Sequence, residues 1–86
     1  MQIKIPLTVR EVAGEYFLIP IGKSALDLNG MITTNDVGVS IWNALAQAED
    51  EEDLVRAIME EYEADENQVR SDVLAFLAQL RSLGII

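Results

Sequence analysis

Apolar and polar residues alternate at the start of the chain. Isoleucine, leucine and valine occupy every second position from Ile3 to Val9, a period of two that is typical of a β-strand with one buried face. Pro6 lies within this run and favours an edge strand, because proline cannot donate a hydrogen bond to a sheet. A second strand is expected at 15–20, after Ala13-Gly14, which we interpret as a two-residue hairpin turn.

A short third strand is predicted at Met31-Ile32-Thr33, because two turn signals separate it from the hairpin. Ile21-Gly22-Lys23-Ser24 is turn-like in composition. Asp27-Leu28-Asn29-Gly30 contains an Asn-Gly pair, which favours a tight turn. Three short strands joined by turns predict a three-stranded antiparallel sheet.

The apolar period then changes to between three and four residues, which predicts three helices. Asn35 or Thr34 can cap the first helix and Asp50 the second, while Asp65 can cap the third and forms a capping-box pair with Gln68. The predicted buried faces are Val37, Ile41, Trp42 and Leu45 in the first helix, Leu54, Val55, Ile58, Met59 and Tyr62 in the second, and Val69, Val73, Phe76, Leu77 and Leu80 in the third.

The third helix carries more apolar surface than one core face needs, up to its expected end at Gly84. Leu74 lies off the buried stripe. It belongs to a neighbouring line at helical spacing, formed by Arg70, Leu74, Leu77 and Arg81. An apolar line between two cations suggests a surface that receives a partner. The alternative is that Ile85, Ile86 or the N-terminal strand covers Leu74.

Strands followed by helices predict an α+β fold, in which a three-stranded antiparallel sheet and three helices form one winged-helix-like domain over 1–86. The net charge is −9 and is unevenly distributed. Ten acids and one base, Arg56, lie between Glu49 and Glu66. We interpret this stretch as a solvated face that maintains solubility, with a docking face for a basic partner as the alternative.

Several functions are disfavoured by composition. Six Lys and Arg residues against fifteen acids argue against nucleic-acid binding. The chain contains no Cys and no His, so the commonest general base and zinc ligand are missing, and we expect no enzymatic activity, no metal and no cofactor. No apolar run is long enough to span a membrane. These features fit a cytoplasmic protein.

A series of short motifs resembles the PqqD-like family, also called RiPP recognition elements. The motifs cover almost the whole chain in the family's order. They are Gly14-Glu15-Tyr16, Ile19-Pro20-Ile21-Gly22, Asn29-Gly30-Met31-Ile32, Asn35-x-x-Gly38-x-x-Ile41-Trp42, and Val69-x-x-Asp72-Val73-x-x-Phe76-Leu77-x-x-Leu80 followed by Leu83-Gly84-Ile85. One departure is Gln47-Ala48-Glu49-Asp50, which stands where the family often has a Gly and a Thr.

The resemblance implies a non-catalytic module that binds the leader segment of a ribosomally synthesised precursor peptide. Such modules present the peptide to a modifying enzyme, commonly a radical S-adenosylmethionine enzyme. The leader is expected in a groove between the third strand and the third helix, which on this chain gives the peptide-binding residues Met31, Ile32, Thr33, Arg70, Val73, Leu74, Leu77 and Arg81.

A free edge on a short third strand would also allow a peptide to add as a further strand. Arg70 and Arg81 are then expected to meet carboxylates on that peptide. The alternative function is a structural or regulatory winged-helix protein that dimerises through its sheet edge or its N-terminal strand. The sequence names neither the peptide, its modification nor the enzyme, and it leaves both a monomer and a homodimer open.

Overall fold

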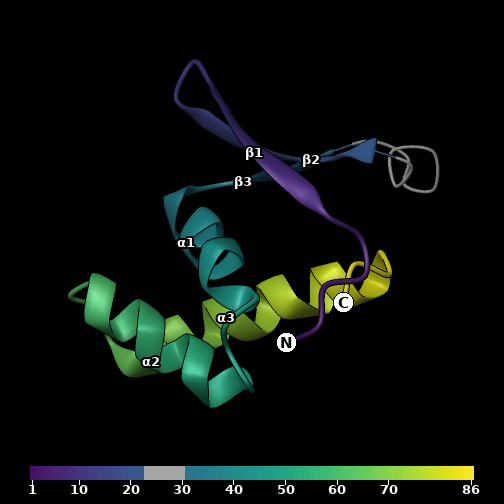
Figure 1. Ribbon diagram of the computed structural model, residues 1–86. Helices are drawn as coiled ribbons and strands as arrows, with labels where there is room; N and C mark the ends of the chain where they lie inside the picture. The colour runs from purple at the N-terminus through teal and green to yellow at the C-terminus, as the bar shows by residue number, and fades with distance from the viewer. Residues whose placement is uncertain (23–30) are drawn as a thin grey trace.

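The computed structural model describes residues 1–22 and 31–86. The turn predicted at Asp27–Gly30, and the Lys23-Ser24 part of the preceding turn, lie outside these residues. The elements follow in the order β1 (Leu7–Val12), β2 (Glu15–Pro20), β3 (Ile32–Thr34), α1 (Asp36–Leu45), α2 (Glu51–Glu61) and α3 (Glu66–Ser82), as Figure 1 shows. The predicted α+β order, an antiparallel sheet followed by three helices, is confirmed.

The sheet has the strand order β1-β2-β3, so β1 and β3 are its two edges. β1 and β2 form a hairpin in which Val12 pairs with Glu15, leaving Ala13 and Gly14 as the turn. Both turn residues have positive φ, 53° at Ala13 and 81° at Gly14. Positive φ at both central positions is the conformation of a type I′ turn, whose twist matches that of the flanking strands. The predicted two-residue turn is therefore confirmed.

The first strand begins later than the alternation predicted, at Leu7. The backbone before Pro6 instead follows the C-terminal end of the chain, because the N–H groups of Lys4 and Ile5 donate to the Ile85 carbonyl at 2.7 and 3.3 Å. The two ends of the chain accordingly lie close together in Figure 1. Ile3 and Ile5 still pack against the core. The alternation before Leu7 therefore reflects packing of every second side chain against the core in a segment that does not belong to the sheet.

Each helix begins at the predicted cap, because a side-chain oxygen accepts a hydrogen bond from a free N–H of the first turn. The bonds are Gly38 N–H to Asn35, Asp53 N–H to Asp50 and Gln68 N–H to Asp65, at 2.9, 3.0 and 3.2 Å. These contacts fix the residues at which α1 begins, directly after β3, and at which α3 begins.

The end of α3 is fixed by Gly84, whose φ of 74° turns the chain back. The Gly84 N–H donates to the Arg81 carbonyl and the Ile85 N–H donates to the Leu80 carbonyl, at 3.0 and 2.9 Å. This pair of bonds is a Schellman motif, which satisfies carbonyls that the helix leaves free. It also directs the buried side chain of Ile85 into the core.

The core lies between the sheet and the helices, and every element contributes to it. The buried apolar residues are Leu7, Leu18, Ile32, Ile41, Trp42, Leu45, Ala48, Leu54, Val55, Ile58, Val69, Val73, Phe76, Leu77, Leu80 and Ile85. Val37, Met59 and Tyr62, which were expected on buried faces, pack against the core but are only partly buried. No helix in the described ranges combines the length and apolar character that crossing a membrane requires.

Candidate functional site

A hollow of about 220 Å³ lies where the end of β3, the first half of α1 and the middle of α3 meet. We call it the β3–α3 hollow. It is lined by Thr34, Asn35, Val37, Gly38, Ile41, Asp72, Ala75, Phe76 and Gln79. Small-molecule pockets begin at roughly 300 Å³, so this hollow is smaller than such a pocket and suits a side chain.

Local sequence explains why α1 leaves this space open. Asn35 ends β3 and caps α1, so the strand passes directly into the helix. Gly38, in the first turn, has no side chain, and the side chain of Thr34 occupies the space that a Cβ atom there would need. The helix can therefore approach the end of β3 closely while the next turn presents Ile41 to the hollow.

α3 presents different residues on the two sides of its buried stripe. Successive residues turn about 100° around a helix axis, so Arg70 and Asp72 point roughly 160° apart. The residues beside the hollow, here called the groove flank, are Asp72, Ala75, Phe76 and Gln79. The opposite side, here called the arginine flank, carries Arg70, Leu74 and Arg81.

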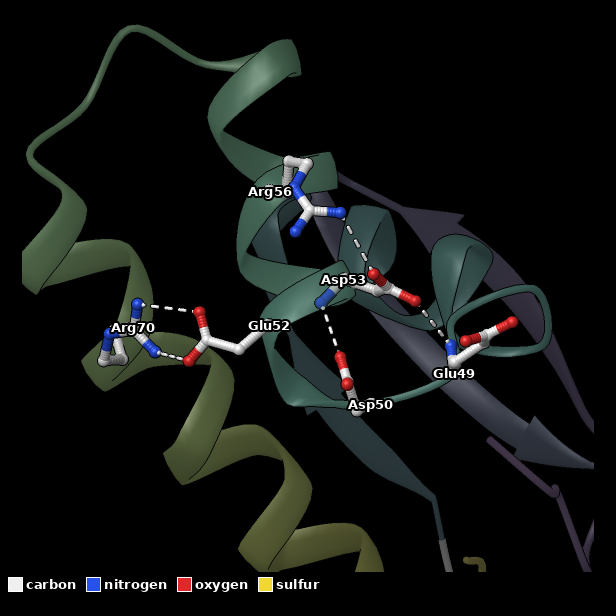
Figure 2. A network of polar contacts seen from close by, with 6 residues as sticks. All are labelled: Glu49, Asp50, Glu52, Asp53, Arg56 and Arg70. Atoms are coloured by element: carbon white, nitrogen blue, oxygen red, sulfur yellow. Dashed lines mark hydrogen bonds and ion pairs between the residues drawn. The ribbon is translucent and has the colours of Figure 1, made fainter.

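The arginine flank faces the acidic start of α2. Figure 2 shows the Arg70 guanidinium paired with both oxygens of the Glu52 carboxylate, with Nη2 3.1 Å from Oε2. Arg81 Nη2 lies 3.5 Å from Glu51 Oε1. The hydrogen bond from Arg70 holds the pKa of Glu52 below its ordinary value, and Glu52 in turn raises the pKa of Arg70. Both cations expected to meet a peptide therefore already have carboxylate partners within the chain.

The predicted apolar line on α3 is only partly a surface. Leu74 is 42% exposed, so the alternative that Ile85, Ile86 or the N-terminal segment covers it is wrong. Leu77 and Val73, by contrast, are fully buried in the core. They support the helix from beneath and expose no surface to a partner, because helical period places them on the core stripe as well as near Leu74.

The strand side of the predicted site is an edge of the sheet. Among the residues that the structure describes, β3 pairs with β2 on one side only, with Leu18 opposite Ile32 and Tyr16 opposite Thr34. The strand is shifted by one residue from the predicted Met31–Thr33. Ile32 is buried, whereas Met31, just before the strand, is 57% exposed and Thr33 is exposed.

Helical periodicity alone did not identify the groove flank as a surface. Ala75 is small and Gln79 is polar, so neither stands out as a binding residue, and Phe76 was assigned to the core stripe. A signal was nevertheless present in the quoted motifs. Two of these motifs meet at the same hollow although thirty residues of sequence lie between Ile41 and Asp72: Asn35, Gly38 and Ile41 come from one, and Asp72 and Phe76 from the other.

Comparisons with known proteins identify the fold and the family. A solved structure described as TbiB1 in complex with the TbiA(beta) leader peptide matches with a TM-score of 0.68 at 25% sequence identity, over 99% of this chain and 93% of that chain. No curated protein sequence matches the chain. The model of the family described as coenzyme PQQ synthesis protein D (PqqD) matches residues 15–86. That match includes all three helices, β2 and β3, and the chain belongs to the PqqD family.

Proposed function

We propose that this protein is a non-catalytic module that binds the leader segment of a ribosomally synthesised precursor peptide. The observation that carries the proposal is the β3–α3 hollow beside β3, an edge strand of the sheet in the described part of the chain. The peptide lies along β3 and inserts a side chain between β3, α1 and α3. Its affinity comes from main-chain pairing and its selectivity from the hollow.

The edge of β3 suits strand addition for a physical reason. An edge strand has N–H and C=O groups that point away from its single neighbour and need partners. Within residues 1–22 and 31–86, the backbone of Ile32–Thr34 makes no backbone hydrogen bond outside the sheet. A peptide in extended conformation can satisfy these groups without any change in the fold.

The helix side of the proposed site is the groove flank of α3. The exposed Ala75 offers room for a peptide side chain, and Phe76 offers an apolar wall. The arginine flank remains the competing assignment, since Leu74 is exposed there between two cations. The pairing of both arginines with α2 favours the groove flank, because a peptide carboxylate would have to displace Glu51 or Glu52.

Relatives support a peptide partner. The chain belongs to the PqqD family, and the structurally similar TbiB1 was solved with a leader peptide. We further propose that the bound peptide is presented to a radical S-adenosylmethionine enzyme encoded near this chain. Binding without catalysis fits a site that contains one carboxylate and no histidine or cysteine.

Two neighbouring residues on opposite flanks provide the sharpest test. A short precursor peptide encoded beside the gene would be titrated against Ala75→Glu and Leu74→Glu, with amide chemical shifts followed in the unmodified protein. We expect Ala75→Glu to weaken binding at least about tenfold, since it places an unpaired charge in a contact that binding dehydrates. Leu74→Glu should stay within about twofold, because single exposed apolar residues away from a contact contribute little.

The opposite pattern would move the site to the arginine flank and would leave the proposed function intact. Absence of binding, or large shifts confined to α2 with none at β3 and the groove flank, would overturn the proposal. Sedimentation measurements on the same samples address the alternative, a dimer formed through β1 or β3. A dimer that persists unchanged when peptide is added would favour that structural role.

A further inference from the structure

The rim of the β3–α3 hollow carries the carboxylate of Asp72, whose Oδ2 accepts no hydrogen bond from the described residues. Asp72 Oδ1 accepts a hydrogen bond from Gln68 Nε2 at 3.0 Å. No cation within residues 1–22 and 31–86 forms an ion pair with Asp72. Its side chain is exposed on the groove flank, where a bound peptide would pass.

The cations of the three helices are held elsewhere. Arg56 pairs with Asp53, Arg70 with Glu52 and Arg81 with Glu51, all along α2 (Figure 2 shows the first two pairs). The residues that line the hollow include no Lys or Arg. The lining mixes polar and apolar residues: Phe76 belongs to its apolar floor, and Asp72, on the rim, is the one ionisable residue among those that line it.

The spacing of floor and rim matches an extended peptide. Phe76 and Asp72 are four residues apart on α3, which corresponds to about 6 Å along the helix axis. Alternate residues of a strand point to the same face and are about 6.6 Å apart. In Figure 1 β3 and α3 run across the molecule in opposite directions, and Thr34 at the end of β3 lines the same hollow as Asp72 and Phe76, so we expect a strand added to β3 to pass both residues. One such strand can address both residues.

We propose that the hollow selects a peptide segment with a large apolar side chain two residues from a lysine or arginine. The apolar side chain enters the hollow beside Phe76 and Ala75, and the basic side chain pairs with Asp72. An acidic residue at that position is rejected, because two carboxylates on one rim repel each other. The inference rests on the proposed function and adds the chemistry of the peptide to it.

Charge reversal at Asp72 tests this inference with unbiased probes. A display library of random twelve-residue peptides would be selected in parallel on the unmodified protein, Asp72→Lys and Glu63→Lys. Glu63 is exposed and does not line the hollow, and Glu63→Lys changes the net charge by the same amount as Asp72→Lys. Thermal melts establish that each variant is folded, and Asp72→Asn serves as an isosteric second variant.

We expect peptides selected on the unmodified protein and on Glu63→Lys to be enriched in Lys or Arg two positions from an apolar residue. Asp72→Lys should select Asp or Glu at that position. For an individual peptide, Lys→Glu should weaken binding to the unmodified protein roughly tenfold, and less at high salt. Asp72→Asn should largely remove this difference.

Two failures are distinguishable. If peptides are selected with the same charge preference on Asp72→Lys as on the unmodified protein, the role of Asp72 is wrong and the proposed function stands. If none of the folded proteins enriches any peptide, the proposed function falls together with this inference.

Discussion

The side chain of Thr34, at the end of β3, fills the space in which a side chain on Gly38 of α1 would begin. A Cβ atom on Gly38 would overlap the Thr34 hydroxyl oxygen and lie 3.0 Å from the Thr34 Cβ. Both residues line the β3–α3 hollow. The glycine is therefore required by packing, since its helical backbone would accept any residue. This contact sets how closely the edge strand approaches the helix that follows it.

Gly38→Ala should destabilise the protein by about 1–3 kcal/mol, because an added methyl group forces Thr34 or β3 to move. This loss is expected although alanine favours a helix by about 1 kcal/mol over glycine. Urea unfolding measures the change. The same substitution in a Thr34→Ala background should cost less, and Asn43→Ala, on the exposed side of α1, should change stability by less than about 0.5 kcal/mol. Equal costs in both backgrounds would show that another contact restricts Gly38.

Ala13→Gly should stabilise the protein by about 0.5–1 kcal/mol. Ala13 has φ of 53°, a left-handed conformation that costs an L-residue with a Cβ atom roughly 1–2 kcal/mol. Glycine adopts it without that cost, although it loses more entropy on folding. The matched control is Gly14→Ala, which should destabilise because Gly14 has φ of 81°. Urea midpoints that move the same way for both variants would contradict a type I′ turn.

Arg70→Gln should return the pKa of Glu52 to its ordinary range. Arg70 lowers the pKa of Glu52 in the folded protein, so the pair stabilises the fold above the unfolded pKa of about 4.3. That contribution is lost as pH falls through the lower folded pKa. The stability difference between the unmodified protein and Arg70→Gln should therefore be present at neutral pH and vanish in acid.

Carboxyl NMR titration of Glu52 and urea unfolding at several pH values measure both effects. Arg10→Gln, an exposed change on β1, is the control and should leave the Glu52 titration unchanged. A Glu52 pKa that does not respond to Arg70→Gln would refute the pairing of Arg70 with Glu52 of α2.

Trp42→Ala should destabilise the protein by about 3–5 kcal/mol, because the side chain is 8% exposed within the core. This is a large share of the stability of a small domain. Trp42→Phe keeps an aromatic ring and should lose less. Thermal melting followed by circular dichroism compares the two variants. A Trp42→Ala protein that melts like the parent yet loses peptide binding would assign Trp42 to the binding site.

Features governed by local interactions followed from the sequence. The caps at Asn35, Asp50 and Asp65 and the hairpin turn at Ala13-Gly14 depend on residues within a few positions of each other. The α3 core stripe from Val69 to Leu80 was also correct, because helical period places those residues on one face. The family resemblance correctly identified the PqqD family.

Contacts between segments that are distant in the sequence could not be predicted in the same way. The helical periodicity of the sequence shows which residues share a face of α3. It does not show which element each flank contacts, because that depends on how α2 and β3 pack around the helix. Arg70 and Arg81 therefore looked available for a peptide, whereas the fold gives them Glu52 and Glu51 from α2. Likewise, Ile3 and Ile5 alternate like a strand, yet their backbone bonds to Ile85 at the far end of the chain. Asp72 has no cationic partner among the described residues because helical periodicity places Arg70 and Arg81 on the other flank of α3, where they meet Glu52 and Glu51 of α2.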